Sequence, residues 1–328
     1  MRDQRIAFVS VMVVLCAFSS AYPWVGKLER TFAASSPAAS AAAFVGRWDL
    51  TLKAPDREYP SWLEVSEDGG TLKAEYVGRW GNARALPKVE VANGKLTFVS
   101  PKEEEAMPTD MVFEGTLAGK TLSGKVNGPN NTTWEWTGAR APLLERKTMP
   151  KWGKAIALFN GKDLTGWKMS AAGKNEWKVE NGILVKPAGG PELISDAKFD
   201  DFKLHVEFKC GQASNSGVYL RGRYEVQIET DSIEDPPNRR MGGIYGFIAA
   251  SPEQPRTADV WQTYDITLVG RRVSVVQNGQ TIINNKEIPG ITGGALDSHE
   301  GLPGPIYLQG SEKGRVEFRS IAITPGAQ

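Results

Sequence analysis

The sequence predicts an all-β protein in which a jelly-roll sandwich follows a small antiparallel β barrel or sandwich domain. Three observations support this class. The chain has 35 Gly and 20 Pro among many short alternating apolar runs, as expected for strands separated by turns. Asn-Gly pairs, which favour tight hairpin turns, separate several of these runs. No helical period of useful length occurs between Phe44 and the end of the chain. At 328 residues, the chain is long enough for two domains.

The first residues are typical of an export signal. Arg2 and Arg5 precede an uncharged apolar run at residues 6–18, and small residues follow it. This run is shorter than the ~20 residues that a membrane span needs. We therefore expect residues 1–21 to be a signal peptide, the protein to be periplasmic or secreted, and no membrane association once the peptide is removed. Residues 22–43, rich in Ala and Ser, are expected to be a flexible low-complexity lead.

Residues 44–140 are expected to form the first β domain. They consist of short alternating runs, and Asn93-Gly94 lies between two of them, which predicts an antiparallel meander that closes to protect its edges. Trp48 lies in a Gly-x-Trp sequence similar to the start of lipocalin-like barrels and is expected to fill the barrel core. Residues 141–153 contain two prolines and no alternation, so they are expected to be a linker.

Residues 154–325 are expected to form the jelly-roll domain. In "KLHVEFKC", apolar residues alternate with polar ones from Leu204 to Cys210. One face of this strand is therefore expected to pack in the core and the other to face solvent. About twelve such strands fit a jelly roll, whose curved sheet offers a concave face to a ligand. Cys210 is expected to fill a core position, because removal of the signal peptide would leave it without a partner.

The stretch "NSGVYLRGRYEVQIETD" contains the candidate site. In "YEVQIE", alternation places the apolar residues on one face and Glu225, Gln227 and Glu229 on the other. The preceding strand should pair with it through a turn at Gly222. That turn is expected to bring Arg221, together with Tyr219, close to Glu225.

Aromatic and amide side chains accompany these residues. The following occur where alternation could place them on the same polar face: Tyr219, Tyr245, Trp261, Tyr307 and Gln309. Aromatic platforms combined with Arg, Glu and Gln suit sugar recognition, because sugar rings stack through their C–H faces and hydrogen-bond through their hydroxyls. We expect a carbohydrate site here. The alternative is an ordinary exposed sheet face with weak cross-strand ion pairs.

Several other classes of function lack support in the sequence. The balance of 39 Lys+Arg against 38 Asp+Glu indicates no nucleic-acid partner. The two histidines, His205 and His299, have no metal-ligand spacing. The glycine-rich segments lack the pattern of a phosphate or dinucleotide loop, and no serine nucleophile elbow is present.

Several segments, in this order, resemble the 3-keto-disaccharide hydrolase domain family: "AIALFNGKDLTGWK", "WKVENGILV", "FDDFKLHVEFK", "NSGVYLRGRYEVQI", "GGIYGFIAAS", "WQTYDITLVG" and "GPIYLQGSEKGRVEFRSIAI". The resemblance covers residues 154–325 and implies a concanavalin A-like lectin/glucanase sandwich. It also implies an exported enzyme that cleaves glycosides already oxidised at carbon 3. Relatives commonly carry a His after the "YLQ" strand, where this chain has Ser311 and Glu312, so His299 or Glu312 could replace it.

The implied reaction needs a base, an acid for the leaving oxygen and donors for an enediolate. Glu225 is expected to be the acid/base, with Arg221 and Gln227 binding the keto-sugar oxygens. The residues expected to shape the pocket are Tyr219, Tyr245, Trp261, Tyr307, Gln309 and His299. No cofactor is certain. A divalent cation could chelate the enediolate through Glu229, Asp231, Glu234 and Asp235, although a solvated acidic loop is the simpler interpretation.

Two other functions stay open. A laminarinase-type retaining glycosidase would use carboxylates at alternate positions of one strand, about 5–5.5 Å apart. This chain matches that pattern in part, because Glu225 and Glu229 are separated by an amide, Gln227, at the middle position. A non-catalytic carbohydrate-binding protein would need the same platform without turnover.

Overall fold

The computed structural model describes residues 40–230, 234–310 and 313–327, and residues 38–328 form one compact unit. The expected signal peptide and all but the last few residues of the expected lead lie outside the described residues. Within those residues, no helix is long and apolar enough to cross a membrane.

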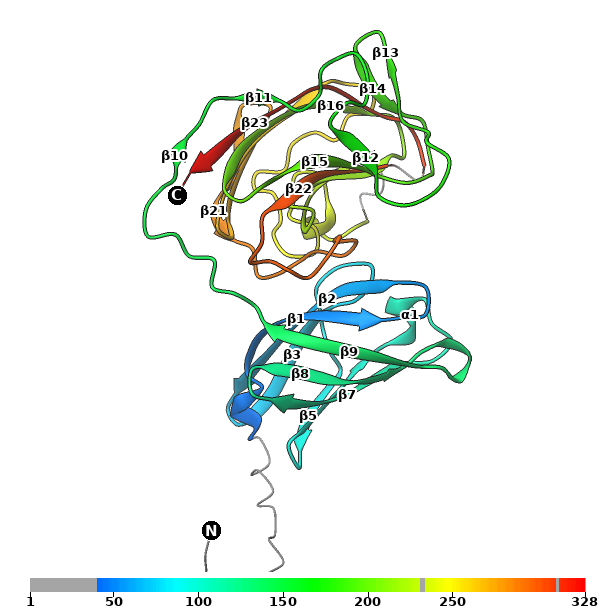
Figure 1. Cartoon of the computed structure of the whole chain (residues 1–328), viewed down its shortest axis with the longest axis vertical. Helices are drawn as coiled ribbons and strands as arrows, with labels where there is room; N and C mark the ends of the chain where they lie inside the picture. The colour runs from blue at the N-terminus through cyan, green and yellow to red at the C-terminus, as the bar shows by residue number, and fades with distance from the viewer. Residues whose placement is uncertain (1–39, 231–233, 311–312, 328) are drawn as a thin grey trace, which may run out of the picture. The chain divides into compact units, whose positions relative to one another are not determined.

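A nine-stranded antiparallel sheet forms from the first half of the chain (Figure 1). Its strands are β1 (Gly46–Lys53), β2 (Glu58–Asp68), β3 (Thr71–Val77), β4 (Arg84–Ala85), β5 (Lys88–Ala92), β6 (Lys95–Ser100), β7 (Met111–Ala118), β8 (Thr121–Asn127) and β9 (Thr133–Arg140). The strand order is β4-β3-β2-β1-β9-β8-β7-β6-β5, in which β1 and β9, the first and last of these strands along the chain, pair with each other. Because β3 also contacts β5, near the other end of this order, the sheet curls into a barrel (Figure 1) around a core that includes Trp48.

Short helices are few among the described residues: η1 (Ala41–Ala43), α1 (Lys102–Glu105), η2 (Pro129–Asn131) and η3 (Pro237–Arg239). The predicted all-β class, with a barrel ahead of a sandwich, is confirmed.

Two further sheets form the sandwich, and they lie face to face (Figure 1). The larger runs β13-β14-β23-β16-β19-β20-β21, with β10 and β11 also paired to β23, and the smaller runs β12-β15-β22-β17-β18. The bounds are β10 (Lys151–Trp152), β11 (Ile156–Ala157), β12 (Trp167–Met169), β13 (Lys178–Glu180), β14 (Ile183–Lys186), β15 (Leu193–Phe199), β16 (Phe202–Cys210), β17 (Asn215–Leu220), β18 (Tyr224–Glu229), β19 (Gln262–Val269), β20 (Arg272–Gln277), β21 (Gln280–Glu287), β22 (Gly304–Gln309) and β23 (Val316–Ala327).

The alternation of buried and exposed residues along the strands shows which of their faces pack in the sandwich core. On β16, buried residues alternate with partly exposed ones, as the sequence predicts, and Cys210 is buried with a free thiol. Burial raises the pKa of this thiol to about 12, so it is a packing residue and not a nucleophile.

Three of the five Asn-Gly pairs in the chain form hairpin turns. Asn93-Gly94, Asn181-Gly182 and Asn278-Gly279 join β5 to β6, β13 to β14 and β20 to β21, and all six residues have φ between 51° and 80°. Positive φ at both central residues is the requirement of a type I′ turn, so the local signal in the sequence sets these registers.

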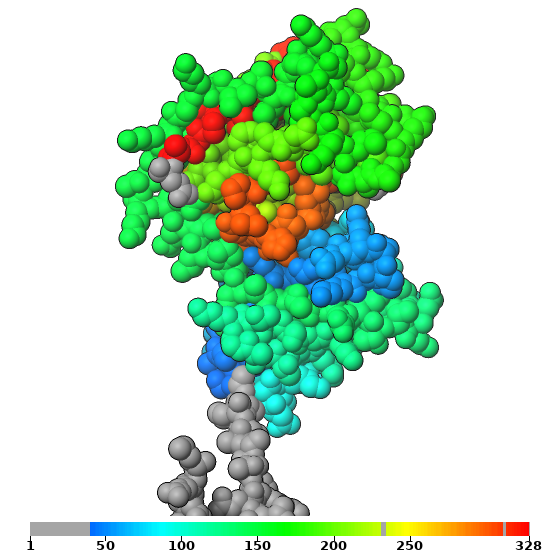
Figure 2. Space-filling model, in the orientation of Figure 1, coloured from blue at the N-terminus to red at the C-terminus, as the bar shows by residue number. Residues whose placement is uncertain are grey.

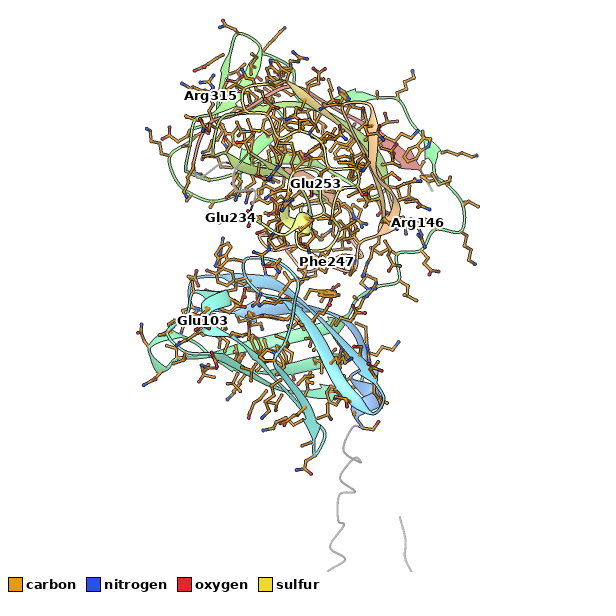
Figure 3. The ribbon with its side chains drawn as sticks, turned by 180° about the vertical axis from the view of Figure 1, so that it is seen from behind. Glu103, Arg146, Glu234, Phe247, Glu253 and Arg315 are labelled. Carbon is orange, nitrogen blue, oxygen red and sulfur yellow. The ribbon has the colours of Figure 1, made fainter. Side chains whose placement is uncertain are left out.

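The segment after β9 runs along the sandwich. Arg146, labelled in Figure 3, donates to Asp201 at 2.8 Å and to Asp200 at 2.7 Å. Lys151 and Trp152, within the expected linker, form β10 against the C-terminal part of β23. The linker is therefore held by the sandwich at both of these points.

Candidate active site

The candidate site lies on the outer face of the smaller sheet, where β22, β17 and β18 are neighbours. In one row across these strands, Tyr307 is opposite Tyr219, which is opposite Glu225. In the next row, Gln309 is opposite Gly217, which is opposite Gln227. The register therefore brings together five residues that the sequence analysis placed on one polar face.

Gly217 leaves a hollow in the middle of this surface. It has no side chain, and a Cβ built there would collide with Oε1 and the carboxyl carbon of Glu225. The glycine therefore lets the Glu225 carboxyl lie back over the sheet, between the amides of Gln227 and Gln309. Gly217 does not have a positive φ, so the space taken by the Glu225 carboxyl, and not the backbone conformation, accounts for a glycine at this position.

A cavity of about 370 Å³ opens over this surface, a volume typical of small-molecule sites. From the sandwich it is lined by Ser170, Ala171, Glu192, Asn215, Tyr219, Glu225, Gln227, Tyr245, Gly293, Gly294, Ala295, Leu296, Tyr307 and Gln309. The barrel contributes Arg57, Glu58, Tyr59, Pro60, Arg79, Trp80 and Gly81. Six of the nine sequence-predicted site residues thus line one cavity.

A larger cavity, about 870 Å³, is lined largely by residues of the segment after β9 and by β19 and β20. Two of its carboxylates, Glu64 and Glu287, are ion-paired with Arg47. Its wall lacks a buried carboxyl group comparable to that of Glu225, and the chemistry therefore points to the smaller cavity.

Glu225 is the buried carboxyl of the site, with 3% of its surface exposed. Burial raises its pKa to about 8, against a smaller lowering by the hydrogen bond with Tyr219. A carboxyl with such a pKa changes protonation near neutral pH. That is the property required of a general acid or base.

The Tyr219 hydroxyl connects Glu225 to the backbone. Its oxygen lies 2.9 Å from Glu225 Oε2 and 2.8 Å from the carbonyl oxygen of Gly293. A phenol has one proton and cannot donate to both acceptors fully. When Glu225 is protonated, its O–H can donate to the phenol oxygen while the phenol donates to Gly293; when Glu225 is ionised, the phenol can turn and donate to it.

Two amide oxygens face the same surface without a protein partner. Gln227 Oε1 and Gln309 Oε1 are buried and accept no hydrogen bond from the residues that the structure describes, whereas Gln227 Nε2 donates to Asn215 Oδ1 at 3.3 Å. Buried acceptors of this kind cost free energy unless they are satisfied. Sugar hydroxyls in the cavity would supply the missing donors.

The expected placement of Arg221 beside Glu225 is wrong. Arg221 has φ of 53° in the turn between β17 and β18, so strand alternation no longer governs its direction. Its fully buried guanidinium donates to the Tyr224 hydroxyl at 3.1 Å and to the Gly270 carbonyl at 2.8 Å, and it pairs with Asp200. It supports the sandwich core and does not line the cavity.

Trp261 also lies away from the cavity. Its ring is covered by the Arg319 guanidinium, 4.4 Å from the ring centroid, and by the Lys209 ammonium at 5.2 Å. Both cations extend from the larger sheet, on β23 and β16. Trp261 is therefore on a polar face, as expected, but on that of the other sheet.

His299 lies on a surface loop before β22, coloured orange in Figure 2. Its side chain is 69% exposed and is 3.6 Å from Asp297. It does not line the cavity, so its expected place in the pocket is wrong. Ser311 and Glu312, the other positions considered for the missing His, lie outside the described residues.

No group of three or more His, Cys, Asp or Glu side chains is arranged to hold a metal ion in the described part of the chain. Of the acidic residues considered as cation ligands, Asp231 lies outside that part. Glu229 Oε1 accepts from Arg256 at 2.6 Å and from the Met241 N–H at 3.1 Å. Two protein donors therefore occupy Oε1 of this carboxyl.

The sequence analysis missed the barrel residues that line the cavity. Arg57 and Tyr59 lie at the start of β2, and Arg79 and Trp80 lie between β3 and β4. No alternation or motif links these segments to a strand more than a hundred residues later. Glu192, whose carboxyl accepts from the Ser170 hydroxyl at 2.6 Å, was missed for the same reason.

Known proteins resemble this chain in its sandwich region. The sequence model of the 3-keto-alpha-glucoside-1,2-lyase-like domain matches residues 154–324. A 3-keto-disaccharide hydrolase from Bacteroides thetaiotaomicron is 22% identical over 39% of this chain and 57% of that protein, so the match spans little more than half of this curated relative.

Solved structures of candidate glycosyl hydrolases from Parabacteroides distasonis ATCC 8503 are similar as well. One is 28% identical, with a TM-score of 0.46, over 55% of this chain and 92% of that chain. Another is 19% identical, with a TM-score of 0.43, over 52% and 93%.

Proposed function

This chain belongs to the 3-keto-alpha-glucoside-1,2-lyase-like family, and we propose that it cleaves glycosides whose sugar is oxidised to a ketone at carbon 3. The observation that carries this proposal is the buried carboxyl of Glu225, with its pKa near 8, on the wall of a sugar-sized cavity rich in amides and phenols.

A ketone at carbon 3 makes the proton on carbon 2 acidic. Ionised Glu225 would remove that proton, and the electron pair left on carbon 2 would form an enediolate with the ketone. Collapse of the enediolate would expel the leaving oxygen from carbon 1, with a proton returned to it from protonated Glu225 or from solvent. Addition of water across the resulting double bond would then complete net hydrolysis.

Phenols and amides of the cavity suit the negative charge of this intermediate. Burial raises the pKa values of Tyr245 and Tyr307, so both phenols stay protonated as hydrogen-bond donors at neutral pH. The side-chain amides of Gln227 and Gln309 provide further polar groups. Donors fixed in a partly buried site stabilise a developing oxyanion more than water does.

The direct test is turnover. The protein is incubated with 3-keto-trehalose, 3-keto-lactose and the two parent sugars, with and without a chelator, and products are followed by mass spectrometry. Release of the free sugar and a 3-keto product from the oxidised compounds only would support the proposal. Cleavage of the parent sugars at an equal rate, or of none of the four, would contradict it.

Tyr219→Phe should move the pH dependence of kcat/KM to higher pH. The phenol's hydrogen bond lowers the pKa of Glu225, so its removal should raise that pKa above the wild-type value of about 8. Because the base acts when ionised, the rising limb of the pH profile should shift upward. A pH profile with an unchanged midpoint would show that Tyr219 does not act on the ionising group.

A laminarinase-type mechanism has less support. It needs a second carboxylate facing Glu225, but Glu229 is bound by Arg256 and the Met241 N–H and does not line the cavity. Cleavage of laminarin would favour that alternative. Binding of sugars without any turnover would favour a carbohydrate-binding protein.

We further propose that the protein acts in the periplasm or outside the cell, as the apolar run at residues 6–18 suggests. Fractionation of cells that express the full chain would test this. Retention in the cytoplasm at full length would contradict it.

A further inference from the structure

We propose that the barrel builds the leaving-group subsite of this cavity, in which Trp80 stacks on a ring-shaped leaving group and Arg57 hydrogen-bonds to its oxygens. The inference rests on the proposed function, because it takes the sugar oxidised at carbon 3 to lie over Glu225. The matched family covers only residues 154–324, so it assigns nothing to the barrel.

The barrel wall of the cavity is an aromatic and cationic cluster. The rings of Tyr59 and Trp80 meet edge to face, with centroids 5.8 Å apart. The Arg57 guanidinium lies 4.6 Å from the Tyr59 centroid and 5.4 Å from that of Trp80. Trp80 is nevertheless 46% exposed, which leaves a large part of the indole for a ligand.

Arg57 is available to a ligand. Within the described ranges, no carboxylate lies within ion-pair distance of its guanidinium, which packs against the two rings. Its positive charge also opposes, across the cavity, the rise that burial causes in the pKa of Tyr307. A guanidinium held over aromatic rings keeps its edge donors free for ligand oxygens.

The segment that carries Trp80 is fixed in two ways. Within the barrel, Arg79 donates to the Glu105 carbonyl at 3.0 Å, and Arg84 pairs with the buried Glu105 carboxyl. Against the sandwich, the same segment contacts two glycines. A Cβ at Gly246 would collide with Asn82, and one at Gly293 would collide with the Gly81 carbonyl.

An apolar contact next to this segment holds the barrel and the sandwich together. Trp62 and Val77 of the barrel belong to the buried core of the sandwich. The Trp62 ring meets that of Phe247, labelled in Figure 3, edge to face at 5.3 Å, and a Cβ at Gly290 would collide with it. Trp80 is thus presented on a preorganised wall, which lowers the cost of binding.

The two walls have different chemistry. The sandwich wall holds the titrating carboxyl and the amide acceptors, and it suits the reacting keto sugar. The barrel wall offers a ring face and a cation with free donors, and it suits a second ring with oxygen substituents. A disaccharide has such a ring in its leaving group and an aryl glycoside has a ring without the hydroxyls, whereas a methyl glycoside has no ring there.

The test compares phenyl, glucosyl and methyl 3-keto-glucosides as substrates of the full chain. For Trp80→Ala, kcat/KM should fall at least about 10-fold more with the two ring-bearing substrates than with the methyl compound. Trp261→Ala is the matched control, because that tryptophan lies outside the cavity, and it should show no such selectivity. An equal loss of Trp80→Ala with all three substrates would overturn the subsite.

A binding measurement separates this inference from the proposed function. Isothermal titration with the unoxidised phenyl, glucosyl and methyl glucosides needs no turnover. Tighter binding of the ring-bearing compounds by the wild type, lost in Trp80→Ala and kept in Trp261→Ala, would support the subsite even if no keto sugar were cleaved. If the wild type turns over keto sugars but does not bind ring-bearing ligands more tightly than the methyl compound, the subsite is wrong and the function stands.

Discussion

Glu225→Gln should lower kcat with a 3-keto-glucoside by about 10²- to 10⁴-fold, the range expected for loss of a general base. The amide has nearly the shape of the carboxyl and can still accept a hydrogen bond from Tyr219, but it cannot take a proton from carbon 2. The fold should be retained, because Gln removes a buried ionisable group without creating a cavity. Steady-state kinetics between pH 6 and 10, with circular dichroism as a check of folding, would measure the effect.

A surface variant provides the control for this experiment. Glu114→Gln removes a carboxylate that is 54% exposed and paired with Lys95, and an exposed pair of this kind contributes little to stability. It should keep wild-type kcat. Normal turnover by Glu225→Gln would show that another group is the base, and a loss of substrate binding without a loss of kcat would assign Glu225 to recognition.

Strand alternation predicted much of the candidate site because three strands of the smaller sheet are neighbours. Glu225 and Gln227 share a face on β18, as Tyr307 and Gln309 do on β22, with Tyr219 of β17 between them. Period-two patterning is local, so it could be read from the sequence. The Asn-Gly hairpins were predictable for the same reason.

The three residues placed wrongly lie where strand alternation ends, or where local alternation cannot show to which of the two sheets a residue belongs. Arg221 lies in a turn with positive φ, so its side chain goes to the core side. Trp261 directly precedes β19, and alternation could show that it faces outward but not from which sheet. His299 lies in a loop, where no periodicity applies.

The barrel wall of the site could not be predicted from any local pattern. Trp80 and Arg57 line the cavity because the barrel packs against segments of the sandwich that are more than a hundred residues away in the sequence. Glycines such as Gly293 allow the two backbones to approach closely. In the sequence, Gly293-Gly294 belongs to a glycine-rich segment without the pattern of a phosphate or dinucleotide loop. In the structure, the Gly293 carbonyl accepts a hydrogen bond from Tyr219. Because Gly293 has no side chain, the Gly81 carbonyl of the barrel can pack against it.

A second buried carboxyl lies away from the cavity, where β1 of the barrel meets the loop before β22. Asp49 is 6% exposed, and both burial and the neighbouring Glu300 raise its pKa well above the usual carboxyl range. Glu300 is itself fully buried and accepts from Arg271 at 2.7 Å and from the Tyr224 hydroxyl at 2.6 Å. Asp49 therefore keeps its proton at neutral pH in the folded protein.

Asp49→Asn should stabilise the protein at pH 8 and have little effect near pH 4. In the unfolded chain Asp49 ionises above about pH 4, whereas in the folded protein it stays protonated to much higher pH. The wild type therefore loses stability, by at most about 1.4 kcal/mol per pH unit, as the pH rises between these two pKa values. Asn donates a hydrogen bond to Glu300 without a proton to lose, so its melting temperature should exceed that of the wild type at pH 8 by several degrees.

Glu300→Gln should have the opposite effect. It removes the anionic partner of Arg271, which is 5% exposed, and breaking a buried pair in this way costs about 3–5 kcal/mol. Melting curves of the wild type and both variants at pH 5, 7 and 8.5 would distinguish the two carboxyls, because Asp49→Asn should gain stability over the wild type as the pH rises, whereas Glu300→Gln should already be less stable than the wild type at pH 5. If Asp49→Asn were less stable than the wild type at pH 8.5, Asp49 would have to be ionised in the folded protein, and Arg271 and Arg223, which oppose the rise of its pKa, would then dominate its surroundings.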